Sequence, residues 1–479
     1  MMTMIFIYLP WRGPGVEKQE VRMRLLPFIV LTSALTLPAA GPVRAQDDYP
    51  LHHPETLRRY EALNRAADGQ DPLRLRDVEV HPYLSGTDTL FNLYDRQRIS
   101  PAPLDLPCAA LPLLRLLDGT RSRPAILQTL ARDPAGETRV REWLQALDEG
   151  LFLEDRRFRE HLIALVRDFQ AAPVREPICA GNAYARDPDE LRAWVSGQLD
   201  LSHPSAPSPR VAGLIAPHID YGRGAPTYAK AYARLKGQRG VARVVILGTA
   251  HMPAYRPFAF TRKAYETPLG RCRTDTAFVS RLLARYPHPA FEDEFLHRGE
   301  HAIELQLPYL QALFGPEVAL VPILCGSLHT FIESGDDPME DAAIRDFRDA
   351  LRAALAASPG RTLIVAASDL AHMGRQFGDR FAMTDDVLRQ VEADDRRMLV
   401  PVIQGDADGF LRDLVHDRDA RRICGSAPIY TLLKVLEPKP GTLLEYRQCT
   451  DPARTCTVTI PAIIYHSHES RVTSPESDP

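Results

Sequence analysis

Three histidines of this 479-residue chain stand at the ends of short apolar runs. His218, His251 and His372 each follow such a run directly or within a few residues. Runs of this length are typical of buried strands in a parallel sheet, because helices cover both faces of such a sheet. The polar residues that bind ligands in these sheets gather at the carboxyl ends of the strands. We therefore expect the three imidazoles to line one crevice.

Carboxylates and a phenol accompany two of these histidines. Asp220 and Tyr221 follow His218, and Asp369 precedes His372 by three positions. An imidazole has a pKa near neutrality, so His372 is predicted to act as a general acid–base group. Asp369 is predicted to orient His372 or a ligand histidine, as carboxylates behind metal ligands do. Asp220 and Tyr221 are predicted to line the pocket, the tyrosine as a hydrogen-bond donor.

Two further motifs carry side chains suited to catalysis or metal binding. In the sequence EHAIE, His301 and Glu304 are three positions apart and would share one face of a helix. Two interpretations stay open for this pair: acid–base groups that reach the pocket, or structural residues that cap and pack. Cys424 lies in the sequence Ile-Cys-Gly and is either a metal ligand or a buried, inert thiol.

Five short islands, taken together and in this order, resemble the Memo family. Two more segments, Thr267–Gly270 and Arg375–Phe381, also fit that family. The resemblance covers a little over half of the chain, and the full architecture resembles the component called AmmeMemoRadiSam system protein B. The five islands are residues 216–221, 248–251, 300–308, 368–372 and 423–429.

The resemblance implies both a metal site and a fold. Members of the Memo family are described as binding iron or copper through two histidines and a cysteine, which correspond here to His218, His251 and Cys424. Imidazole suits both metals, and thiolate is a soft ligand that favours copper(I) and can bind iron. The family shares its α/β fold with the class III non-haem iron extradiol dioxygenases. Non-haem iron oxygenases use two histidines and a carboxylate, so a cysteine here changes the electronics of the metal.

Two functions follow from the resemblance. The first is redox or oxygen-dependent chemistry at an iron or copper ion, on a small or peptidic substrate. The second is a non-catalytic module that binds a peptide or another ligand and acts with a radical SAM enzyme and an AMMECR-type partner. Measurements of metal content, and of ligand binding after chelation, distinguish these two functions. Whether the protein is an enzyme stays open at this point.

The elements that position these residues are predicted to form an α/β domain over residues 210–466. Strand-like runs alternate there with amphipathic helical segments, which favours a central sheet flanked by helices on both faces. Two runs at 442–448 and 458–465 predict a closing hairpin. Residues 467–479 are polar and are predicted to be a disordered tail.

A smaller unit is predicted to precede this domain. Residues 75–168 combine short strands with three short helices, which is the pattern of a winged-helix-like domain. The stretch Leu116–Asp155 resembles the PqqD-like modules, which capture a leader peptide by adding it to a sheet edge. The alternative is a plain packing domain. Residues 46–74 and 169–209, which are polar or proline-rich, are predicted to be linkers.

The N-terminus bears on the compartment. Residues 1–45 are predicted to be either a signal peptide that starts at Met23 or an over-extended leader. The first interpretation implies an exported or periplasmic protein, and the second a cytoplasmic one. Two prolines interrupt the apolar run, which argues against a stable membrane span. Cys449 and Cys456 flank a turn, where a disulfide would fit export and two separate thiols are the alternative.

Composition excludes one class of partner. The chain has 45% apolar and 25% charged residues and a net charge of −4, which are ordinary values for a globular protein. A protein that binds nucleic acid needs a basic domain or stripe, and this chain shows none. We therefore expect a small-molecule or peptide ligand and no nucleic acid.

Overall fold

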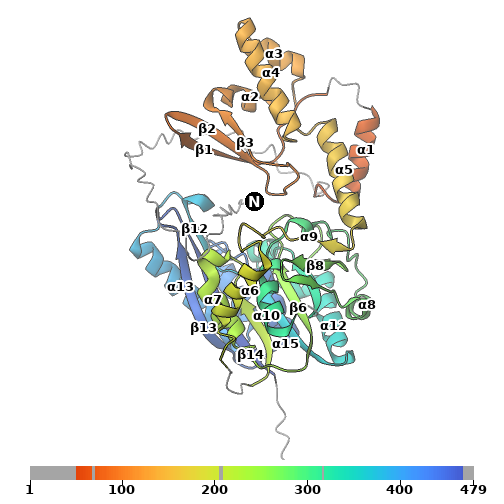
Figure 1. Ribbon diagram of the computed structural model, residues 1–479, viewed down its shortest axis with the longest axis vertical. Coiled ribbons are helices and arrows are strands. Elements are labelled where there is room, and N and C mark those ends of the chain that lie inside the picture. Colours follow the sequence, from red (N-terminus) through yellow and green to blue (C-terminus); the bar gives the residue numbers. More distant parts are fainter. Residues whose placement is uncertain (1–49, 67–70, 204–208, 316–317, 468–479) are drawn as a thin grey trace, which may run out of the picture. The chain divides into compact units, whose positions relative to one another are not determined.

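The computed structural model describes residues 50–66, 71–203, 209–315 and 318–467. The chain divides between Ala171 and Ala172 into an N-terminal and a C-terminal unit (Figure 1). The predicted leader at 1–45 and almost all of the predicted tail at 467–479 lie outside the described residues. Within the described ranges, no helix combines the length and the apolar character needed to cross a membrane.

An eight-stranded mixed sheet forms the centre of the C-terminal unit. Four parallel strands make its middle, in the spatial order β5, β11, β6 and β10. Antiparallel strands complete it: β14 pairs with β5, β7 with β10, and both β12 and β13 with β14. The bounds are β5 Val211–Ala216, β6 Val241–Thr249, β7 Phe258–Phe260, β10 Ala319–Cys325, β11 Arg361–Ala367, β12 His372–Gly374, β13 Thr442–Thr450 and β14 Cys456–His466.

Helices cover both faces of this sheet, which confirms the predicted α/β architecture (Figure 1). Successive residues of a strand point to opposite faces, so Leu214 of β5 packs into one apolar core and Ile215 into the other. The first core receives α6 Pro188–Leu199, α7 Tyr221–Ala233 and α10 Leu307–Phe314. The second receives α8 Thr276–Leu283, α12 Ala342–Ala357, α13 Asp385–Gln404, α14 Ala407–Asp417 and α15 Ser426–Leu436.

Shorter elements complete the C-terminal unit. A second sheet of three strands has the order β4, β8, β9. Its strands are β4 Val174–Arg175, β8 Ala264–Thr267 and β9 Gly270–Cys272. The short helices are α9 Leu296–Gly299 and α11 His329–Ser334, and single 3-10 turns span Glu304–Gln306, Pro338–Glu340 and Arg375–Phe377.

The closing hairpin is confirmed as β13 and β14, although its two cysteines are not bonded. The antiparallel register places Cys449 opposite Val458 and Thr450 opposite Thr457. Cys449 and Cys456 therefore are not direct cross-strand partners, and both remain thiols. Both side chains are buried in the apolar core, where burial raises the pKa of each thiol to about 12.

The linker predicted at 169–209 is largely wrong. Residues 172–203 belong to the C-terminal unit and include β4 and α6. Leu191, Val195 and Leu199 lie one helical turn apart along α6 and are fully buried in the first core. Asp187 caps the N-terminus of this helix by accepting hydrogen bonds from two backbone N–H groups. The proline-rich composition of this segment obscured α6, whose buried side chains belong to the first core of the C-terminal unit.

The N-terminal unit has the predicted mixture of short strands and helices. Its antiparallel sheet has the order β1, β2, β3. The linker predicted at 46–74 instead contains a helix, α1, whose Tyr60 ring lies edge-on to Phe158 of α5 at 6.3 Å. The winged-helix assignment stays a prediction. The bounds are β1 Glu79–Ser85, β2 Asp88–Tyr94, β3 Leu104–Pro107, α1 Pro54–Ala66, α2 Leu111–Leu116, α3 Arg123–Leu130, α4 Pro134–Glu149 and α5 Arg156–Ala171, with a 3-10 turn at Cys108–Ala110.

The corrected boundary predicts how two fragments behave. A fragment of residues 172–479 is expected to unfold cooperatively, whereas a fragment of 210–479 is expected to stay unfolded or molten. The shorter fragment lacks the three buried side chains of α6, each worth about 1.5–3 kcal/mol. Circular dichroism during thermal denaturation measures the transition, and equal melting temperatures for the two fragments would contradict this boundary.

Candidate metal centre

The carboxyl ends of three parallel strands lie at one level. In the sheet, Ala216 at the end of β5 pairs with Ala367 at the end of β11, and Ala367 pairs with Gly248 of β6. The loops that follow these strands therefore start side by side. His218 lies in the loop after β5, and His251 lies in the loop after β6. The two histidine-bearing loops therefore begin at the same end of the sheet.

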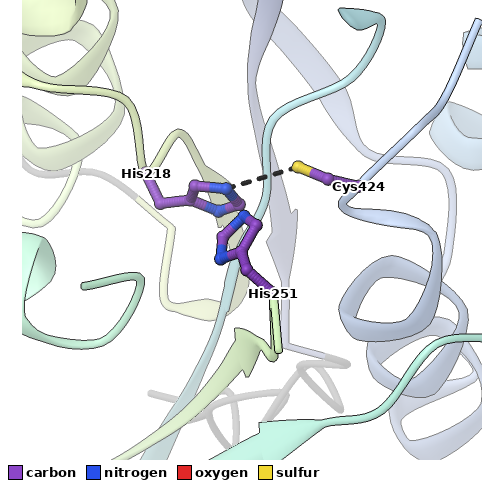
Figure 2. A group of neighbouring side chains, drawn as sticks. All are labelled: His218, His251 and Cys424. Atoms are coloured by element: carbon purple, nitrogen blue, oxygen red, sulfur yellow. Dashed lines mark hydrogen bonds between the residues drawn. The ribbon is translucent and has the colours of Figure 1, made fainter. Parts of the chain in front are cut away.

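His218, His251 and Cys424, the three ligands implied by the resemblance, converge on one point. One ligand atom from each lies within 4.8 Å of the others. The Cys424 Sγ atom is 3.3 Å from Nε2 of His218, and Figure 2 shows both side chains pointing toward each other beside His251. The two imidazole rings lie edge to face with centroids 4.9 Å apart. Three donor atoms from distant parts of the chain therefore face a shared centre.

Hydrogen bonds at Nδ1 fix the tautomer of both rings. Nδ1 of His218 is 2.9 Å from the carbonyl oxygen of Ala367, and Nδ1 of His251 is 2.9 Å from the Glu300 carboxylate. These oxygens only accept hydrogen bonds, so each Nδ1 carries the proton. Burial also lowers the pKa of His218, which favours the neutral ring. His218 therefore keeps its lone pair on Nε2, the form that binds a metal.

Glu300 lies beside His251 and His301, and no role was predicted for it from the sequence. Its carboxylate accepts hydrogen bonds from the backbone N–H groups of His251, His301 and Ala302. It also accepts from Nδ1 of His251 and lies 3.1 Å from Nδ1 of His301. Burial by itself raises the pKa of Glu300, but His251 and His301 hold that pKa well below its usual value. One ionised side chain thus orients two imidazoles. The sequence feature that could have identified Glu300 is its position directly before His301.

The structure brings His301 into the same group. Its ring stacks on His251 with centroids 4.7 Å apart and an interplanar angle of 16°. The ring of His218 is 5.5 Å away, edge to face. His301 is buried, and its Nδ1 lies 3.1 Å from the Glu300 carboxylate. Its ring lies beside those of His218 and His251, and its acid–base role stays a prediction.

Comparison with known proteins identifies the family. A family model described as "Memo-like protein" matches residues 175–459, which is more than half of the chain. The chain belongs to the Memo-like family. A MEMO1 family protein of Aquifex aeolicus is 25% identical over 356 residues, which cover 72% of this chain and 89% of the relative. A MEMO1 family protein of Desulfurococcus amylolyticus is 29% identical and covers 58% of this chain and 93% of the relative.

The donor set of this Memo-like protein fits a transition-metal ion. Two imidazoles and a thiol make a mixed nitrogen and sulfur site, which suits iron, copper or zinc. Burial, reinforced by the negative charge of Asp369, raises the pKa of Cys424 well above its usual value. A cation bound at this centre would reverse that effect, because a coordinated thiol loses its proton. Ser368 Oγ and Asp369 Oδ2 are also buried and have no hydrogen-bond partner among the described residues.

Asp369 and His372 lie on the β11 side of this Memo-like site. Asp369 accepts a hydrogen bond from the backbone N–H of His218 at 2.8 Å, and its second oxygen is 3.8 Å from Nε2 of His218. The carboxylate thus holds the backbone of the His218 loop, and its role in orienting an imidazole stays a prediction. Nδ1 of His372 donates to the carbonyl oxygen of Leu370, 3.0 Å away. Burial lowers the pKa of His372 to about 4, so the expectation of a pKa near neutrality is wrong.

Three other predicted residues have their polar atoms committed elsewhere. Glu304 is fully buried, and its carboxylate accepts from Arg175, Tyr184 and two backbone N–H groups, so it is a structural anion and is not available for catalysis. Asp220 caps α7 and pairs with Arg223. Tyr221 is buried and donates its hydroxyl hydrogen to the carbonyl oxygen of Leu305, so these two predicted pocket residues also have structural roles.

The space around Gly425 shows how tightly the turn that carries Cys424 is packed in this Memo-like protein. A Cβ added at Gly425 would lie 2.5 Å from the carbonyl oxygen of Asp369 and 2.5 Å from Cβ of Ser368. Gly425→Ala is therefore expected to destabilise the C-terminal unit by about 1–3 kcal/mol through overpacking. Chemical denaturation followed by fluorescence measures this loss.

Gly197 provides the control, because a Cβ added to this residue of α6 would meet no atom within 4 Å. Gly197→Ala is expected to be neutral or to stabilise by up to about 1 kcal/mol, since alanine is the better helix former. Equal denaturation midpoints for Gly425→Ala and the unaltered protein would show that the Cys424 turn is not tightly packed.

Proposed function

We propose that this Memo-like protein binds one iron or copper ion through His218, His251 and Cys424. The observation that carries the proposal is the convergence of their three ligand atoms within 4.8 Å. Hydrogen bonds at Nδ1 of both histidines support it, because metal-binding histidines usually bond a carbonyl or carboxylate oxygen through their other ring nitrogen. A cavity built only for packing would not need two imidazoles with matched tautomers.

We further propose that the centre carries out redox or oxygen-dependent chemistry on a small or peptidic substrate. Iron or copper at this position would supply redox and Lewis-acid chemistry. His372 is neutral at pH 7, so it serves as a hydrogen-bond or proton acceptor at Nε2 and not as an acid. His301, with its ring 5.5 Å from that of His218, is close enough to hydrogen-bond a ligand in the crevice. Asp369 keeps the His218 loop in place.

The thiol separates this site from the proposed relatives among the extradiol dioxygenases. A facial arrangement of two histidines and a carboxylate supports oxygen activation in non-haem iron enzymes. Here Cys424 completes the group, and Asp369 approaches it only to 3.8 Å from Nε2 of His218. We therefore propose a redox enzyme with the dioxygenase-like fold, and we do not assign ring cleavage to it.

A second candidate function is a peptide-binding module that acts with a radical SAM enzyme and an AMMECR-type partner. The N-terminal unit favours it, because β1 lies at one end of its sheet order and pairs with β2. Tyr83 and Leu84 of this strand are exposed, the latter by 66%. A peptide strand would add to that edge. Peptide binding that survives chelation of the metal would support this function over the redox one.

The compartment also separates the two candidates. Radical SAM chemistry is cytoplasmic, so a signal peptide that starts at Met23 and is removed on export would argue against such a partner. N-terminal sequencing of the protein from its native cells decides between the two. A start after residue 45 supports export and the redox function, whereas an uncleaved leader keeps the radical SAM partnership.

Metal analysis of purified variants tests the proposed centre. His218→Ala and Cys424→Ser are each expected to weaken metal binding by more than the roughly 10–100-fold that loss of an outer-shell partner costs. Each removes one of only three ligands. Metal content per chain is measured by mass spectrometry after dialysis against a weak chelator.

His288 offers a matched control for these variants. It pairs with Asp346 at 2.9 Å, outside the described metal group. His288→Ala is expected to keep the metal content of the unaltered protein. Full retention of iron or copper by His218→Ala would eliminate the proposed site.

A further inference from the structure

A buried arginine holds the turn that carries Glu300. Arg175 lies on β4 and is 1% exposed. Its Nε donates to the carbonyl oxygen of His297 at 2.9 Å, and its Nη2 donates to the carbonyl oxygen of Glu300 at 2.7 Å. Its Nη1 donates to the carboxylate of Glu304 and to the carbonyl oxygen of Glu176. The guanidinium thus contacts three points of the segment 297–304.

Glu304 fixes the guanidinium from the other side. Its carboxylate accepts hydrogen bonds from the backbone N–H groups of Ile178 and Cys179, at 3.0 and 2.8 Å. It also accepts from the hydroxyl of Tyr184. Burial raises the pKa of Glu304, but Arg175 and these donors together keep it below its usual value, so the pair is ionised. Segments 174–184 and 297–304 are therefore joined at several atoms.

The same turn supports two imidazoles of the crevice. The backbone carbonyl of Glu300 accepts from Arg175, while its carboxylate orients His251 and His301. Glu300 therefore connects the guanidinium to both rings, through its backbone carbonyl on one side and its carboxylate on the other. A shift of the turn would move the carboxylate, and the Nδ1 hydrogen bonds that set both tautomers would weaken. Arg175 is thus linked to Nδ1 of His251 through Glu300, by one hydrogen bond on each side of that residue.

We propose that Arg175 is a positioning residue for the metal centre, and that Glu304 holds its guanidinium in place. This inference rests on the proposed function, because it assigns a purpose to the Nδ1 hydrogen bond of a proposed ligand. A buried ion pair gives little net stability, since desolvation of the charges offsets their attraction. Its geometric effect is larger: the planar guanidinium presents its donors at fixed angles, and lysine cannot reproduce them.

Arg243 is a matched control within the same unit. It is 5% exposed, pairs with Asp275 at 2.8 Å and donates to the carbonyl oxygen of Pro359 at 2.9 Å. Each of the two arginines also lies 5.1 Å from an aromatic ring centroid. Arg243 stands near the amino end of β6, whereas His251 follows the carboxyl end of that strand. A purely structural effect of losing a buried arginine would appear at both positions.

The test compares four variants of the full chain: Arg175→Met, Arg175→Lys, Arg243→Met and Arg243→Lys. The first measurement is the rate at which each iron- or copper-loaded protein releases its metal to excess chelator. Arg175→Met is expected to release metal about 10–100-fold faster than the unaltered protein, as for loss of an outer-shell partner. Arg175→Lys is expected to recover part of this loss. The Arg243 variants are expected to match the unaltered protein, even where their melting temperature falls.

A second measurement needs no metal. Histidine-selective ¹⁵N NMR of the metal-free proteins reports which nitrogen of each ring carries the proton. Arg175→Met is expected to mix the tautomers of His251 and His301, while Arg243→Met leaves them unchanged. Should the unaltered protein bind no metal, the proposed function fails, and the tautomers alone decide the role of Arg175.

Two results would overturn the inference. One is equal metal release and equal tautomers in the Arg175 and Arg243 variants at matched melting temperature. The other is a full loss of metal binding in Arg243→Met, which would make the effect one of general stability. If Arg175→Met does not fold, Glu304→Gln replaces it, because glutamine keeps the shape of the side chain and removes its charge. That variant is expected to show a smaller change in the same direction.

Discussion

The centre depends on one arrangement of hydrogen bonds, in which imidazole Nδ1 atoms face fixed oxygen acceptors. Two of the acceptors are backbone carbonyls at the end of β11 and in the loop after it, Ala367 for His218 and Leu370 for His372. The third is the Glu300 carboxylate, which serves His251 and His301. In His218 and His372, whose pKa values are lowered by burial, Nε2 keeps the lone pair. The parallel register of the sheet makes this arrangement possible, because it ends β5, β11 and β6 at one level.

Burial makes the charged side chains of this site costly to keep ionised, and it also shifts their pKa values. A charged carboxylate removed from water needs several donors to remain ionised. Glu300 finds them in three backbone N–H groups and two imidazoles, and Glu304 finds them in Arg175, Tyr184 and the segment 178–179. Residues 174–184, which follow the N-terminal unit in the sequence, therefore supply hydrogen-bond donors to the buried carboxylate of Glu304. Glycines permit the closest approaches, as at Gly425 against the backbone of Asp369.

Local pattern was sufficient to predict most of the sheet and the strand ends that carry His218 and His251, whereas the place of Cys424 was implied by the family resemblance. Apolar runs that end in a histidine identified β5, β6 and β11, because parallel strands are buried on both faces. The role of Glu300 was missed, because the spacing of His301 and Glu304 favoured a helix through 301–304, whereas the 3-10 turn begins only at Glu304. The ion pair of Arg175 and Glu304 joins residues 129 positions apart, and no local pattern shows such a contact. The low pKa of His372 likewise comes from burial, which depends on the assembled fold.

X-ray absorption spectroscopy of the full-length protein loaded with iron or copper tests the central claim most directly. The account predicts one sulfur ligand and imidazole nitrogens in the first coordination shell, with the sulfur lost in Cys424→Ser. A first shell of oxygen and nitrogen without sulfur in the unaltered protein, and no change on that substitution, would contradict it.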